Sequence, residues 1–145
     1  MPATHSDVIA EVITRIKTLD LGLFGIRSTD VLERDFPFNS GSPPCPSIIV
    51  SRVIELESAG LNNAQDIAYP VQVLRCGHSL SNRGGGPRTD WRDAIREEFN
   101  HKRMGLDCEL VTKVRFLEMQ YDSAWKTWNL DTSGIRIITW IRKEV

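Results

Sequence analysis

The sequence predicts a single α+β domain, in which a four-stranded, mainly antiparallel sheet carries two helices in the order α-β-β-α-β-β. Two stretches repeat apolar residues at helical spacing, and four others alternate β-branched or aromatic residues with polar ones. The short links within each pair of strands favour antiparallel neighbours. A chain of 145 residues suits one domain with a substantial core, so we expect a single domain over residues 1–145.

The composition argues against several classes of partner and location. The chain has 18 basic and 19 acidic residues and a formal charge of −1, so its net charge does not direct it to nucleic acid or to an anionic membrane. Its three cysteines are widely spaced, and the N-terminal residues lack the pattern of a secretory signal. The longest apolar runs fall well short of the ~18 residues of a membrane-spanning helix. We therefore expect a soluble, intracellular protein with reduced thiols.

The first helix is predicted by its start signal and its apolar stripe. Thr4 and Asp7 have the spacing of a capping box, in which each side chain satisfies a backbone N–H of the first turn. Apolar residues then recur on one side of a helix that continues to Leu19. Residues 20–46 contain several prolines and glycines and keep no period, which predicts an irregular connector. Its leucine, isoleucine and phenylalanine side chains argue against free disorder.

Two strands are expected next, over residues 47–56 and 67–76. The polar stretch 57–66 between them predicts a hairpin with a long loop. Pro70 lacks an amide donor, so the second of these strands should lie at an edge of the sheet or carry a bulge.

The second half of the chain repeats the pattern of a helix followed by two strands. Thr89 or Asp90 is the predicted N-cap of a helix that runs to about Arg103, with Trp91 on its buried side. Strands are expected over residues 108–121, with both faces covered, and over 134–143, where Trp140 fits a core position.

The cysteines and histidines are the candidate metal ligands and catalytic groups of this sequence. Cys76 and His78 form one close pair of zinc-ligand types, which Cys45 and Cys108 would have to complete from distant positions. Buried or half-buried free thiols are the simpler interpretation. His101, near the predicted helix end, is interpreted as a solvated side chain that suits the helix dipole. No histidine lies in a nucleophile motif, so we expect no enzyme. The spacing of the cysteines and histidines does not suit a zinc site, so we also expect no metal, and we expect no cofactor.

A glycine-rich loop precedes the second helix. A loop before a helix N-terminus is one way to bind phosphate, but this one lacks the P-loop lysine and the GxGxxG spacing. We interpret it as a mobile loop that orders against a neighbouring protein. The interleaved acids and arginines of the following helix also argue against sequence-specific nucleic-acid binding. The candidate interface residues of this loop are Arg83, Gly84, Gly85, Gly86 and Arg88.

Two tryptophans are placed where burial within one small domain is not assured. Trp125 and Trp128 lie in the polar stretch 122–133, between the last two predicted strands. Loop aromatics at such positions suggest a protein interface. The alternative is that they fold back over an edge of the sheet.

The chain resembles the tail-terminator or tail-completion proteins of tailed bacteriophages. The matching features are the N-terminal amphipathic helix, the proline-rich entry into a strand, a polar loop before the next strand, a central helix of the "WRxxIRxxF" type and the closing pair of strands. The segments that carry the resemblance are Pro46-Ser47-Ile48-Ile49-Val50, Asp66-Ile67-Ala68-Tyr69-Pro70-Val71-Gln72-Val73 and Asp90-Trp91-Arg92-Asp93-Ala94-Ile95-Arg96-Glu97-Glu98-Phe99.

The resemblance implies a role in a virion that is assembled in the host cytoplasm. A member of that family would form a homo-hexameric ring that caps the tail tube and joins it to the head-completion proteins of the neck. Its expected partners are copies of itself, the tail tube protein, a head-completion or neck protein and, if the tail is contractile, the end of the sheath. The alternatives are another neck or tail component, such as a stopper, connector or tube-like subunit, and a small metal- or ligand-binding domain.

Overall fold

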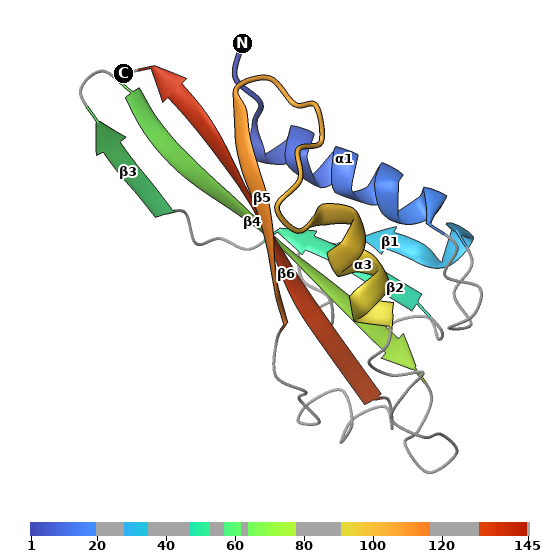
Figure 1. The fold of residues 1–145 in the computed structure, drawn as a ribbon. Coiled ribbons are helices and arrows are strands. Elements are labelled where there is room, and N and C mark those ends of the chain that lie inside the picture. Colours follow the sequence, from blue (N-terminus) through green and yellow to red (C-terminus); the bar gives the residue numbers. More distant parts are fainter. Residues whose placement is uncertain are drawn as a thin grey trace.

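The computed structural model describes residues 1–19, 28–34, 47–52, 57–61, 64–77, 91–116 and 131–144, and for 57–61 and a few strand ends only the backbone. These residues form an α+β fold in which two α-helices pack on a six-stranded mixed sheet (Figure 1). The path through the sheet is β1-β2-β4-β6-β5, and β3 pairs with β4 off this path. The predicted class and both helices are therefore confirmed, whereas the sheet is larger than expected.

Helix α1 (His5–Thr18) begins as the sequence predicts. The Thr4 amide donates to the Asp7 carboxylate at 2.9 Å, and the Asp7 amide donates to the Thr4 hydroxyl at 3.3 Å. This reciprocal pair satisfies two donors that a helix start leaves without partners. The buried side of the helix consists of Val8, Ile9, Val12 and Ile16.

The expected irregular connector contains a regular element. A 3-10 turn, Ser28–Asp30, leads into the short strand β1 (Val31–Glu33), which pairs in parallel with β2 (Ser47–Arg52). The prediction for 20–46 is wrong at this point. Three residues are too few to show a period, so the strand depends on the hydrogen bonds that β2 offers rather than on its own pattern.

The stretch expected to be a long loop also contains a strand. β3 (Glu57–Leu61) pairs antiparallel with the first part of β4 (Ala64–Gly77), and Leu61 is opposite Ala64. Only two residues of the sequence, Asn62 and Asn63, separate these partners. The polar and small side chains of this strand show no alternating apolar pattern, so the sequence did not predict it. Its pairing rests on backbone hydrogen bonds.

Strand β4 lies in the middle of the sheet, which corrects the expected edge position of Pro70. β3 pairs with residues 64–68 of β4, and β2 pairs with residues 71–76. Pro70 therefore lies between the end of one neighbouring strand and the start of the next. A residue without an N–H is tolerated there because no ladder bond is required of it on that side. On its other side β4 pairs along its whole length with β6 (Asp131–Glu144).

Helix α3 (Trp91–Phe99) is shorter than predicted. It ends four residues before Arg103, because His101 has a positive φ of 59° and turns the chain out of the helix. Lys102 then forms a bridge with Thr112 of β5 (Glu109–Phe116). The last residues of the predicted strand, 117–121, lie outside the described part of the chain.

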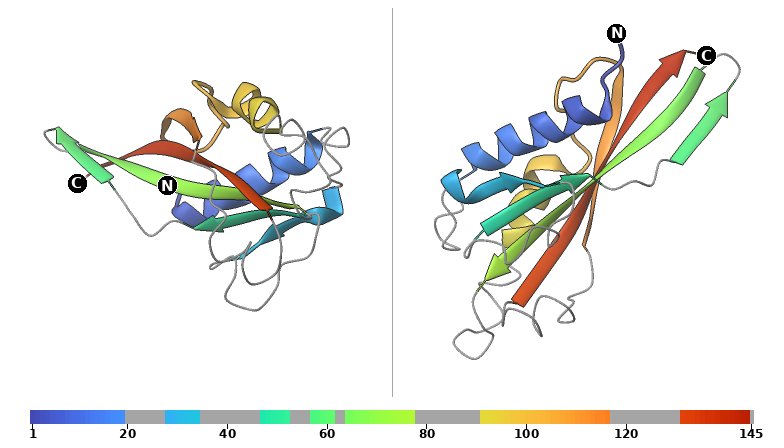
Figure 2. Two further views of the ribbon diagram at one scale, coloured as in Figure 1. Left: turned by 90° about the horizontal axis from the view of Figure 1, so that it is seen from below. Right: turned by 180° about the vertical axis from the view of Figure 1, so that it is seen from behind.

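One hydrophobic core lies between the helices and one face of the sheet. It joins the buried sides of α1 and α3 to alternate residues of β2, β4 and β6, including Val50, Val71 and Ile137. Trp91 has no exposed surface, as its core position predicted, whereas Trp140 is half-buried on the opposite face. In the left view of Figure 2, α1 lies behind the sheet.

The ends of β4 and β6, together with β3, extend beyond the helices as an arm (Figure 2). β4 and β6 each contain 14 residues and pair over that full length. At ~3.3 Å per residue such a ribbon is about 45 Å long. No helix in the described part of the chain is long and apolar enough to cross a membrane.

Candidate interaction surfaces

The interface residues predicted from sequence cannot be placed in this fold. Trp125 and Trp128 lie outside the described residues, as do Arg83, Gly84, Gly85, Gly86 and Arg88 of the glycine-rich loop. Both groups therefore stay predictions. The described surfaces provide other candidates, which pattern analysis did not identify.

Most of the residues considered as metal ligands lie outside the described part of the fold. Cys45 and His78 lie outside it, and so does the side chain of Cys76. Cys108 is exposed, in a left-handed turn with φ 63°, which corrects the expectation of a buried or half-buried thiol. Among the described residues no group of three or more His, Cys, Asp or Glu side chains could hold a metal ion. His101 is exposed, as expected.

His5 connects the start of α1 to the point where β2 gives way to β3. Its Nε2 lies 2.8 Å from the carbonyl oxygen of Pro70, and its ring stacks on Tyr69 with centroids 5.0 Å apart. The Tyr69 hydroxyl is hydrogen-bonded to the Lys143 ammonium group. Burial lowers the pKa of His5, and the nearby Arg52 lowers it further, while the bond to Pro70 opposes both. This cluster fixes the helix to the central strand.

The edge strand β5 is covered at its backbone but exposes its last side chain. The His101 amide donates to the Thr112 carbonyl at 2.7 Å, and the Val114 amide donates to the Asn100 side chain at 2.9 Å. Phe116 is 37% exposed, and the guanidinium groups of Arg92 and Arg96 lie 4.5 and 5.7 Å from its ring centroid. An exposed aromatic ring flanked by arginines is typical of interface residues.

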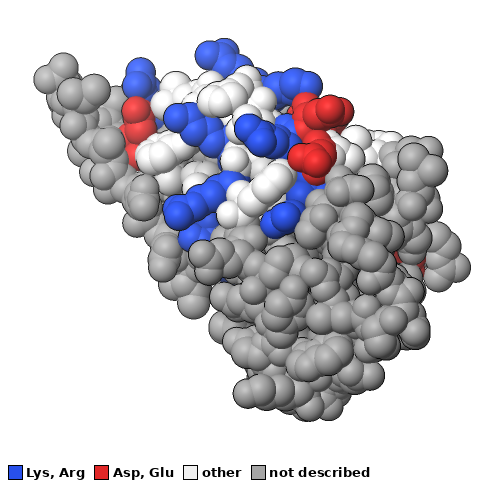
Figure 3. Space-filling view, turned by 60° about the horizontal axis from the view of Figure 1, so that its bottom comes forward, with Lys and Arg blue, Asp and Glu red and all other residues white. Residues whose placement is uncertain are grey.

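A basic surface lies on the face of the sheet opposite the helices. It consists of Lys113 and Arg115 on β5 and Arg136 on β6, where Arg115 and Arg136 are direct neighbours across the strands. Lys113 and Arg115 are exposed. Figure 3 shows Lys and Arg side chains gathered around uncharged residues here, with Asp and Glu at the margins. Like charges directly opposite each other destabilise a strand pair, so this arrangement is not explained by the stability of the sheet.

Half-buried apolar residues lie within the same basic surface. Val111 pairs with Trp140, and Lys113 pairs with Ile138, so both apolar residues of β6 alternate with Arg136 on this face. Aromatic and apolar groups mixed with arginine are characteristic of protein contacts. A surface that binds the backbone of DNA is more polar.

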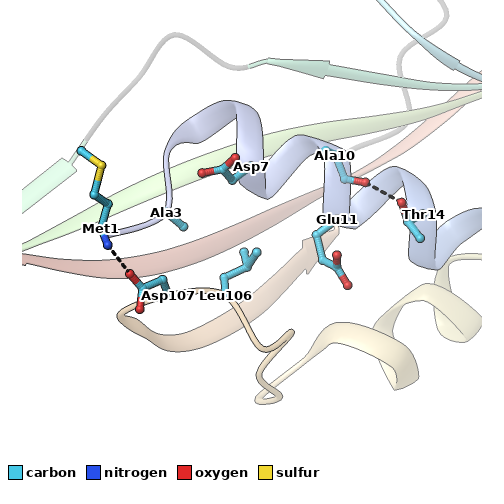
Figure 4. Close-up of a pocket in the computed structure, with 8 residues that line it drawn as sticks. All are labelled: Met1, Ala3, Asp7, Ala10, Glu11, Thr14, Leu106 and Asp107. Carbon is cyan, nitrogen blue, oxygen red and sulfur yellow. Dashed lines mark hydrogen bonds and ion pairs between the residues drawn. The ribbon is translucent and has the colours of Figure 1, made fainter.

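An acidic hollow lies on the helical side of the molecule, between the start of α1 and the turn before β5 (Figure 4). Its volume is about 320 Å³, and its charged lining consists of Asp7, Glu11, Asp107 and the N-terminal amine. The amine of Met1 is 2.9 Å from the Asp107 carboxylate, and Arg15 is 2.9 Å from Glu11. Hydrogen bonds from Thr4 lower the pKa of Asp7 and keep it ionised.

The acidic hollow has fewer positive charges than negative ones. Arg15 contacts not only Glu11 but also Glu98, at 3.4 Å. One guanidinium is therefore shared between two carboxylates, while the N-terminal amine faces Asp107 and Asp7 has only uncharged donors in the contacts above. Among the described residues, the carboxylates of Asp7, Glu11 and Asp107 and of the neighbouring Glu98 are thus opposed by two cations, Arg15 and the N-terminal amine. The hollow is an exposed region of negative potential that favours a cationic partner.

The comparisons with known proteins show the fold alone. No protein-family model and no curated protein matches the sequence. Among solved structures, the chain is similar to a chain of the virion of a native gene transfer agent particle, with a TM-score of 0.59 and 14% identity over 95% of both chains. The chain therefore shares its α+β fold, nearly from end to end, with a component of a phage-like virion.

Proposed function

We propose that this protein is a structural subunit of a phage-like virion, located at the neck, where a ring of its copies caps the tail tube and joins it to the head-completion proteins. The observation that carries the proposal is the fold shared with a gene transfer agent virion chain over 95% of both chains. The segments that resemble tail-terminator proteins support the more specific role. A subunit of this kind needs no catalytic step and no cofactor.

The surfaces of the fold suit assembly with several neighbours. Among the described residues, no helix packs on the arm formed by β3, β4 and β6, and such a strand ribbon suits pairing or packing with other chains (Figure 1). The basic surface and the acidic hollow lie on opposite sides of the sheet, so one subunit offers different contacts to different neighbours. In the proposed ring, two of these neighbours are the adjacent copies of the chain, and a hexamer contains six copies.

The remaining partners in this proposal are the tail tube and the neck. We assign the contact with the tube or the head-completion protein to the loop residues Trp125 and Trp128 and to the Arg83 to Arg88 loop, because aromatic and glycine-rich loops order against neighbouring proteins. The end of the sheath would be a further neighbour in a contractile tail.

Removing the gene from the particle that encodes it tests the role. Loss of a tail terminator should yield tubes of uncontrolled length that do not join filled heads, and supplying the intact chain should restore joined particles. Loss of a stopper should instead yield heads that leak DNA, with tails of normal length, and would assign the chain to that alternative role in the neck. Normal particles in the absence of the gene would refute a neck function.

The assembled form is tested on the protein alone and on the tail tube. Native mass spectrometry and negative-stain microscopy should show closed rings, either free in solution or bound to one end of isolated tubes. A chain that stays monomeric and does not bind tubes would refute the ring. Stoichiometric zinc in the purified protein would instead favour the alternative of a metal-binding domain.

A further inference from the structure

In the described part of the chain, two surfaces of opposite charge face away from each other. The basic surface, formed by Lys113, Arg115 and Arg136, lies on the open side of the sheet (Figure 3). The acidic hollow, lined by Asp7 and Asp107, lies on the side of α1 (Figure 4). The chain as a whole has a formal charge of −1, so this separation, and not an overall excess of one sign, generates the two fields.

Separated charges favour one symmetry of self-association over the other. A two-fold contact brings the same surface of both copies together, so a two-fold contact through the basic surface would place Lys113 and Arg115 against their own equivalents. Like charges that meet across an interface cost several kcal/mol. A head-to-tail contact instead places the basic surface of one copy against the acidic hollow of the next, and such a contact, when repeated, forms a ring if the rotation between successive copies closes.

We propose that Lys113 and Arg115 of one copy dock against the acidic hollow of the next copy, and that this head-to-tail contact sets the direction of the ring. The inference rests on the ring function proposed above and names its interface. The half-buried Ile138 and Trp140 supply the apolar part of the contact, and Arg136 adds a third positive charge beside Arg115. The shared Arg15 leaves negative charge in the hollow for the incoming cations.

Zero-length cross-linking tests the contact directly. A carbodiimide joins a lysine ammonium to a carboxylate only when the two groups touch, so Lys113 should become linked to Asp107, Glu11 or Asp7. A mixture of isotopically light and heavy protein identifies links between different copies by mass spectrometry. The matched control is Lys113→Arg, which keeps the charge and should assemble normally but should lose these links. Absence of mixed light–heavy links from Lys113 to the hollow, at protein concentrations of hundreds of micromolar, overturns the proposal.

Charge reversal provides the second measurement. Lys113→Glu together with Arg115→Glu should weaken self-association on the order of tenfold or more, because repulsion replaces attraction at the contact. Adding Glu11→Lys and Asp107→Lys to the same chain should recover most of that loss. Assembly should also weaken with added salt for the wild type. Circular dichroism and unfolding curves confirm that each variant is folded.

The outcomes separate this inference from the proposed function. If the reversed variant still forms rings of wild-type stability, the interface is wrong although the ring function stands. If neither wild type nor variant forms rings in solution or on tubes, the ring function itself is wrong. If the reversed variant instead loses binding to a short DNA duplex while its assembly is unchanged, the basic surface serves nucleic acid and the proposal is overturned.

Discussion

Glu109 is the acidic side chain that organises the connection between α3 and β5. It is 8% exposed, and one carboxylate oxygen accepts hydrogen bonds from the amides of Met104 at 2.6 Å, Gly105 at 3.0 Å and Leu106 at 3.4 Å. The other oxygen accepts from the Thr112 hydroxyl at 3.3 Å. The same connection provides Asp107 to the acidic hollow, so its shape matters for the proposed contact.

Replacing Glu109 by glutamine keeps the side-chain volume and removes the charge. Hydrogen bonds to a charged group contribute roughly 1.5–3 kcal/mol each, about twice as much as neutral ones. The two shorter bonds, to the Met104 and Gly105 amides, should therefore lose about half their strength, for a total of about 1.5–3 kcal/mol of unfolding free energy. With an m-value of ~2 kcal/mol/M, the urea midpoint should fall by about 1 M.

Two measurements check this prediction. Urea unfolding followed by tryptophan fluorescence reports the global change, and amide hydrogen exchange of Met104 and Gly105 should accelerate more than exchange in the central strands. The matched control is Glu97→Gln on the exposed side of α3, which should stay within ~0.5 kcal/mol of the wild type. A Glu109→Gln protein with the wild-type midpoint and unchanged exchange at these two amides would refute the account of the connection.

Further predictions concern the helices. Thr4→Ala removes the capping side chain of α1 and should cost about 1 kcal/mol by urea unfolding, whereas Thr14→Ala in mid-helix should cost less; equal effects would contradict the capping account. Because burial lowers the pKa of His5 in the folded state, its contribution to stability is present above pH ~6.5 and is lost as the pH falls through the folded pKa. His5→Gln should therefore flatten the loss of stability between pH 7.5 and pH 5, and an unchanged slope would show that another group is responsible. Trp91→Ala should cost about 3–5 kcal/mol, because the side chain is fully buried, and a loss below 1 kcal/mol would show that the core closes around the space.

The start of α1 and the buried side of α3 were predictable because their signals are local. The capping pair Thr4 and Asp7 is three residues apart, and the apolar stripes repeat within one or two turns, so a short window of sequence contains all the information needed. The long strands β4 and β6 were identified by their alternating patterns, although their ends were placed too far inward. Pattern fades at strand ends, whereas the backbone pairing between them continues.

The candidate surfaces were not predictable in the same way. Lys113, Arg115 and Arg136 come from two strands, and only the register of β5 against β6 brings them together. The acidic hollow likewise joins α1 to a turn about 100 residues later in the chain, and neither segment has a motif. Charged side chains need only a position that is exposed to solvent. Their spacing in the sequence therefore does not indicate which of them meet on one surface.

The sequence by itself determined the α+β class, both helices, the capping of α1 and the buried position of Trp91, because each follows from interactions within a helical turn or from the alternation of a strand. Only the tertiary structure decided the parallel strand β1, the strand β3 and the central place of Pro70. Those features depend on which backbone groups of a neighbouring strand remain available, and that is settled only when distant segments pair.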